Sequence, residues 1–203
     1  MAMPWIDNIK KPNRLSVYSG SLEGAWSALF REALQNFNAL SRTHVLGVTM
    51  TQSKDAPTDS GGANVGVQAG NGQISSTYAK EEKAEFFDGR RMHGRTFLFL
   101  RDGKIEKAFI FLPSQPQINT PWGVRGVGTN IMKLIAVHEL VHACGLTNAE
   151  HSKDDLFQAN PTVDPGTTPA KDRVLIRMGN RDIWMPPLIL SGSTVRHIQQ
   201  LWN

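Results

Sequence analysis

One stretch of the chain, residues 129–145, reads TNIMKLIAVHELVHACG. Apolar residues dominate it and Gly145 closes it, so we expect a buried helix over 129–144 that the glycine terminates. Its two histidines, His138 and His142, are four positions apart and therefore lie about one turn apart on the same helical face. A polar face inside so apolar a helix is costly unless it has partners, which indicates a site rather than ordinary core.

The pentad His-Glu-Leu-Val-His, residues 138–142, has the residue types that a zinc site needs. Two imidazoles at this spacing reach one zinc ion, and a carboxylate beside them can take a proton from zinc-activated water. The pattern arises by chance on the order of once per hundred such sequences, and few chance matches lie in an apolar helix closed by glycine. We therefore expect Zn2+ as cofactor, with His138 and His142 as ligands and Glu139 as the catalytic base.

A catalytic zinc ion takes three protein ligands and leaves its fourth position to water. The single cysteine, Cys144, excludes a cysteine-based zinc cluster, and its place inside the helix predicts a small buried apolar residue. Imidazole is a good zinc donor, so His151 is the preferred third ligand, ahead of the weaker amide oxygen of Asn148. A carboxylate completes the site in the remaining alternative, from Glu150, Asp154 or Asp155.

The motif HExxHxxG followed by a histidine resembles the metzincin clan of zinc metallopeptidases. In that clan the helix ends at the glycine and the chain turns back to deliver a third histidine. Here Asn148 stands at the clan's third-ligand position and His151 follows three residues later. The resemblance therefore implies a turn that is longer by three residues.

The segment 183–202, IWMPPLILSGSTVRHIQQLW, is similar to the end of the matrixin branch of this clan. There a methionine turn lies beneath the metal and precedes a C-terminal helix. The resemblance implies that Met185 is the Met-turn residue, with Met178 as the second choice, although either methionine can simply fill the core. It also implies that Pro186 and Pro187 form the wall of the substrate side-chain pocket.

In metzincins the substrate lies extended against an edge strand above the cleft. By that resemblance we expect residues 108–113 to belong to the edge strand and to line the cleft, with four of them in contact with substrate: Ala108, Phe109, Ile110 and Phe111.

The resemblance implies a zinc endopeptidase that acts on protein or peptide substrates. Two alternative enzymatic functions are a peptidase of another zincin branch with an acidic third ligand and an enzyme that hydrolyses a non-protein amide. The alternative without catalysis is an inactive zincin-like structural or binding module. Glu139 argues against that module, because a purely structural zinc site needs no general base and is closed by four protein ligands.

Periodicity along the rest of the chain predicts an α+β domain with helices packed on a mixed sheet. We expect helices over 21–40 and 191–202, and a loop-like region over 52–77 interrupted by one short strand. The expected strands are 44–50, 63–68, 95–100, 105–112, 174–178 and 181–185. With the resemblance, the fold class becomes zincin/metzincin-like: a twisted mixed sheet, a long N-terminal helix, a zinc-binding active-site helix and a C-terminal helix.

Size and composition set the outer limits. The 203 residues, 40% hydrophobic and 20% charged, fit a single catalytic domain over 1–203 with an irregular N-terminal arm at 1–15. The charge of +4 is spread along the chain, so we expect no nucleic-acid partner. No apolar run of about 18 residues and no signal-peptide pattern occurs, so we expect a soluble monomer, cytoplasmic as encoded or released without a classical signal peptide.

Overall fold

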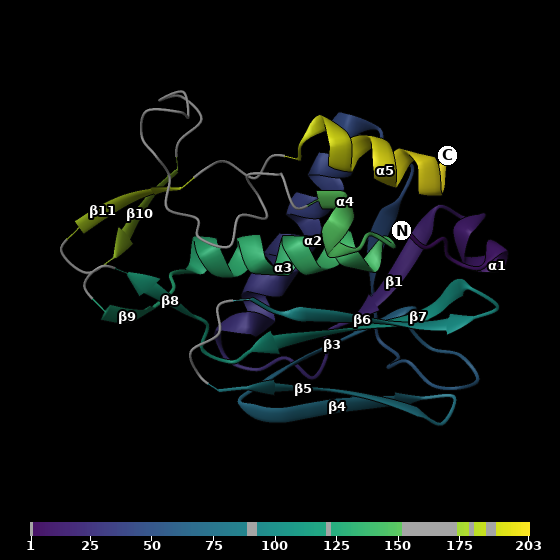
Figure 1. The fold of residues 1–203 in the computed structure, drawn as a ribbon, viewed down its shortest axis with the longest axis horizontal. Coiled ribbons are helices and arrows are strands. Elements are labelled where there is room, and N and C mark those ends of the chain that lie inside the picture. Colours follow the sequence, from purple (N-terminus) through teal and green to yellow (C-terminus); the bar gives the residue numbers. More distant parts are fainter. Residues whose placement is uncertain (1, 89–92, 121–122, 152–173, 179–180, 186–189) are drawn as a thin grey trace.

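Figure 1 shows the computed structural model of the chain. It describes residues 2–88, 93–120, 123–151, 174–178, 181–185 and 190–203. Side chains are described throughout these ranges except at residues 118–120, 123–125, 151, 174–178 and 181–185.

A mixed five-stranded sheet, in the order β2-β1-β3-β7-β6, forms the centre of the fold. Four strands run parallel, and β6 runs antiparallel to β7 and lies at one edge. The turn between these last two strands is made by Asp102 and Gly103, both with positive φ, as the sequence predicts. The strands are β1 (Arg14–Tyr18), β2 (Thr49–Ser53), β3 (Val65–Gly70), β6 (Arg95–Arg101) and β7 (Lys104–Pro113).

Helices cover one face of this sheet (Figure 1). The long helix α2 (Ala25–His44) and the helix α3 (Thr129–Ala143) share one apolar core with inward side chains of the sheet, such as Val17, Val65 and Ile110. The C-terminal helix α5 (Gly192–Trp202) packs into the same core and is capped by the hydroxyl of Ser191. Two short helices are α1 (Asp7–Lys10) and α4 (Asn148–His151).

A hairpin covers the opposite face of the sheet (Figure 1). It consists of β4 (Gly72–Tyr78) and β5 (Glu81–Phe87), and it buries Tyr78 and Phe87 against an aromatic cluster. The sheet contributes the other three members of that cluster, Phe99, Phe109 and Phe111. Alternate residues of β7 thus face the two cores, which explains why that strand is buried almost throughout.

Two further ribbons complete the described fold. Strands β8 (Gln117–Thr120) and β9 (Gly123–Gly126) pair just before α3, and β10 (Val174–Met178) pairs with β11 (Arg181–Met185). No helix of the described part of the chain is long and apolar enough to span a bilayer.

Many expected elements are confirmed, namely the helices at 129–144 and 191–202, the hairpin over 95–112 and the hairpin over 174–185. The strand expected at 44–50 is wrong. Helix α2 continues to His44, Val45 ends it in a left-handed conformation, and β2 begins only at Thr49. The residues between helix and strand are apolar, and Leu46 and Val48 are buried in the core, so this connection resembles a strand in the sequence.

The expectations for the N-terminal arm and for the loop-like region also need correction. The arm at 1–15 is not irregular, because it contains α1 and the first residues of β1, which pairs with two neighbours. The loop-like region at 52–77 contains most of β4 as well as β3, which begins two residues later than expected. Polar side chains dominate β4 because only part of its surface is buried, and such a strand has little apolar periodicity to detect.

The expected edge strand is also wrong. Ala108, Phe109, Ile110 and Phe111 lie in β7, which is bonded to β3 on one side and β6 on the other. Its backbone groups are therefore already paired and cannot bind an extended peptide. The edge strand on this side of the sheet is β6.

Candidate metal centre

The end of α3 is fixed by tryptophans from both ends of the chain. The last carbonyls of a helix have no partner within it. Here the indole of Trp5 donates to the carbonyl of Ala143 at 2.8 Å, and that of Trp202 donates to Cys144 at 3.0 Å. Gly145 follows with φ of +108°, and a Cβ there would lie 2.1 Å from the carbonyl oxygen of Met3. Position 145 therefore has to be a glycine, and the helix ends before it.

His138 and His142 lie one turn apart on α3, and the Nε2 atoms of their rings face each other. Their Nε2 atoms are 3.1 Å apart, and their ring centroids are 4.8 Å apart. In a tetrahedral site with Zn–N distances of about 2.0–2.1 Å, two nitrogen ligands lie about 3.3 Å from each other. The pair is therefore close to the spacing that two imidazole ligands of one zinc ion require.

The orientation of His142 is set by the chain beyond the helix. Its Nδ1 lies 2.8 Å from the carbonyl oxygen of Leu146. A carbonyl only accepts hydrogen bonds, so Nδ1 carries the proton and the Nε2 of neutral His142 keeps its lone pair. Such a bond to the second ring nitrogen is the usual support of a metal-binding histidine.

The third ligand is not defined by the described side chains, among which no three His, Cys, Asp or Glu residues form a metal-binding group. His151 is the last residue of α4, and only its backbone is described. Asn148 begins the same helix and is exposed. The other two candidates named from the sequence, Asp154 and Asp155, lie outside the described residues.

Glu150, the remaining candidate, is engaged elsewhere. Its Oε2 accepts hydrogen bonds from the main-chain N–H of Thr147, at 2.8 Å, and from the hydroxyl of the same residue. The carbonyl of Glu150 also lies 3.1 Å from Nδ1 of His197, which joins α4 to α5. This carboxylate therefore stabilises the turn after α3.

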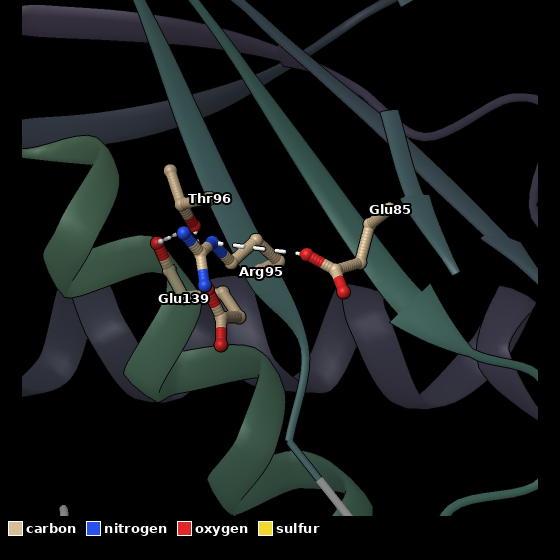
Figure 2. Close-up of polar contacts among 4 residues, drawn as sticks. All are labelled: Glu85, Arg95, Thr96 and Glu139. Carbon is tan, nitrogen blue, oxygen red and sulfur yellow. Dashed lines mark hydrogen bonds and ion pairs between the residues drawn. The ribbon is translucent and has the colours of Figure 1, made fainter. Parts of the chain in front are cut away.

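Glu139 is buried between α3 and the edge strand β6, and only 2% of it is exposed. Figure 2 shows Thr96 of β6 beside it, with its hydroxyl donating to Oε2 of Glu139 at 2.7 Å. Burial raises the pKa of Glu139 to about 7, although the Thr96 hydrogen bond and the charge of Arg95 both act to lower it. A carboxyl group in this range can take and return a proton near neutral pH.

The chain just before β6 packs closely on the side chain of Glu139. A Cβ at Gly94 would lie 2.9 Å from Cγ of Glu139. The absence of a side chain at Gly94 is therefore what allows β6 to approach α3. Arg95, the next residue, is largely exposed, and its Nε lies 3.9 Å from Oε2 of Glu85 on β5 (Figure 2).

Three neighbours of the site have no signal in the sequence. His93 precedes β6, and its ring centroid is 6.2 Å from that of His138. Neither His93, Gly94 nor Thr96 is near the motif in the chain, so no spacing rule identifies them. Cys144 is fully buried, as expected, and burial raises the pKa of its thiol.

The remaining expected site residues are not defined by side-chain positions. Met185 is the last residue of β11 and Met178 the last of β10, and the structure describes the backbone of both. Pro186 and Pro187 lie outside the described residues.

No protein-family profile matches the sequence, and no curated protein matches it significantly.

Proposed function

We propose that the chain is a zinc-dependent endopeptidase whose site is built on α3. The observation that carries the proposal is the pair of Nε2 atoms of His138 and His142, 3.1 Å apart on one helical face. The proton on Nδ1 of His142 leaves a lone pair on Nε2, the nitrogen that faces His138 and that would bind the cation. The buried carboxylate between the two histidines in sequence, Glu139, distinguishes this site from a purely structural one.

His138 and His142 would hold the metal, and His151 is the third ligand that we propose. When bound, zinc would polarise the carbonyl of the scissile bond and lower the pKa of water. Glu139 accepts the proton of the attacking water and then delivers it to the leaving amine nitrogen. The burial of this carboxyl favours its neutral form, so it can hold the proton between these two steps.

The substrate would lie along β6. Within the described residues that strand is bonded only to β7, so its other edge offers unpaired N–H and C=O groups. An extended peptide can pair with such an edge, and the main-chain hydrogen bonds would place its carbonyl groups near α3. The resemblance to metzincins gives the same order along the chain: helix, strands, edge strand and metal helix. By the same resemblance we propose Met185 as the Met-turn residue, and Pro186 and Pro187 as the wall of the substrate side-chain pocket.

Replacing Glu139 with glutamine tests this proposal. An amide accepts the Thr96 hydrogen bond but cannot act as a base, so turnover should fall by about 100-fold to 10,000-fold, with zinc content unchanged. The probe is a mixed-sequence library of internally quenched peptides. The control is Glu32→Gln, which removes an exposed carboxylate that pairs with Lys133 of α3.

Full activity in Glu139→Gln would refute the assigned base. A wild-type protein that holds zinc yet cleaves neither the peptides nor denatured casein would instead support the non-catalytic module.

A further inference from the structure

A part-buried hydrogen bond between β6 and α3 holds the carboxyl group of the proposed base. The hydroxyl of Thr96, on β6, lies 2.7 Å from Oε2 of Glu139 and 3.1 Å from the main-chain oxygen of the same residue (Figure 2). The two residues are 43 positions apart in the sequence. This contact therefore exists only because β6 packs against α3.

We propose that Thr96 is the positioning residue for Glu139, an inference that rests on the proposed peptidase function. A hydroxyl has one hydrogen to donate and two lone pairs that accept. Toward a carboxylate, Thr96 donates. This bond fixes the position of Oε2 and, with it, the plane in which the second carboxyl oxygen lies.

The position of Thr96 is itself fixed. It pairs with Ile110 in the register of β6 and β7, and Ile110 is fully buried in the main core. A threonine side chain is branched at Cβ, which restricts its χ1 rotation. The hydroxyl is therefore held by the sheet and needs little ordering when the substrate binds.

Arg95 is the other polar group of β6 near Glu139, but it is a poor positioning group. Its side chain is 58% exposed, and its pairing with Glu85 is long at 3.9 Å. Exposed ion pairs of this kind contribute little, because water screens them and long side chains must be ordered. Orientation of the carboxyl group therefore depends on the threonine hydroxyl.

The first test separates the hydroxyl from the shape of the side chain. Thr96→Val keeps the shape and removes the hydroxyl, whereas Thr96→Ser keeps the hydroxyl. With the quenched-peptide library, kcat of Thr96→Val should fall by about 10-fold to 100-fold, while KM and zinc content stay near wild type. Thr96→Ser should recover most of kcat. Unchanged kcat in the valine variant, or equal losses in both variants, would overturn the proposal.

The second test needs no activity and so distinguishes this inference from the proposed function. Thermal unfolding is measured for zinc-free wild type, Thr96→Val, Glu139→Ala and the double variant. Thr96→Val should lower Tm by about 3–10 °C when Glu139 is present, and far less in Glu139→Ala. Equal shifts in the two backgrounds would overturn the positioning contact. A clear difference in a protein that cleaves no peptide would support the contact and refute the peptidase function.

Discussion

Replacing Gly94 with alanine tests how closely β6 and α3 pack around the site. The added Cβ would lie 2.8 Å from the carbonyl oxygen of Phe111 and 2.9 Å from Cγ of Glu139, whereas carbon atoms in contact are normally about 3.5–4.0 Å apart. The main chain at Phe111 pairs with strands on both sides and yields little. Overpacking of this kind costs about 1–3 kcal/mol. At about 2–4 °C per kcal/mol for a protein of this size, Tm should fall by about 2–12 °C.

The assay is thermal unfolding followed by circular dichroism, with zinc present and with zinc removed, together with turnover of the quenched peptides. Turnover should also fall, because Glu139 must shift to make room. Gly126→Ala is the matched control, since no atom lies within 4 Å of a Cβ there. Its Tm should stay level or rise slightly, because alanine lowers the entropy of the unfolded chain. Equal Tm and turnover in the two variants would refute the close packing.

Two further predictions concern the third ligand and alkaline pH. His151→Ala should weaken zinc binding by more than about 100-fold, since even the loss of an outer-shell partner weakens it by about 10-fold to 100-fold. His93→Ala should weaken zinc binding less. Zinc affinities are measured by competition with a chelator, and the opposite order of the two variants would make His93 the ligand. Burial, with Glu106 nearby, raises the pKa of Tyr78, so the folded state keeps its proton longer than the unfolded state. Unfolding free energy should therefore fall as pH rises above about 10, and Tyr78→Phe should lose less stability; parallel losses in denaturant titrations at several pH values would contradict this.

The elements that the sequence predicted well depend on local chemistry. The apolar run of α3 and the glycine that follows it, Gly145, can be recognised in the sequence from neighbouring residues alone. The turn at Asp102 and Gly103 depends only on residues that accept positive φ. The histidine pair also follows from local geometry, because helical pitch alone puts His138 and His142 on one face.

The predictions that were wrong concern strands whose position in the fold is determined by long-range packing. A five-residue strand at Arg14–Tyr18 has too few positions for its alternation to be distinguished from an irregular arm. Both strands of the hairpin over 95–113 are apolar, and only the pairing with β3 makes β7 the interior one. Its longer buried run was the available signal, because strands covered on both faces are apolar almost throughout.

The same limit applies to the site. Thr96 and Gly94 contact Glu139 through the packing of β6 on α3, and no spacing within the sequence encodes that contact. The hydrogen bond between His142 and the carbonyl of Leu146 depends on where the chain turns after Gly145. Such contacts become visible only once the strands and helices are in place.

The zinc content of the purified protein shows whether α3 carries a metal site. The protein is purified without added metal and its zinc is measured by elemental analysis, beside a variant in which His138 and His142 are both replaced with alanine. We predict about one zinc per chain in the wild type and none in the double variant. A wild-type chain that contains no zinc and takes up none on addition would show that His138 and His142 do not form a zinc site.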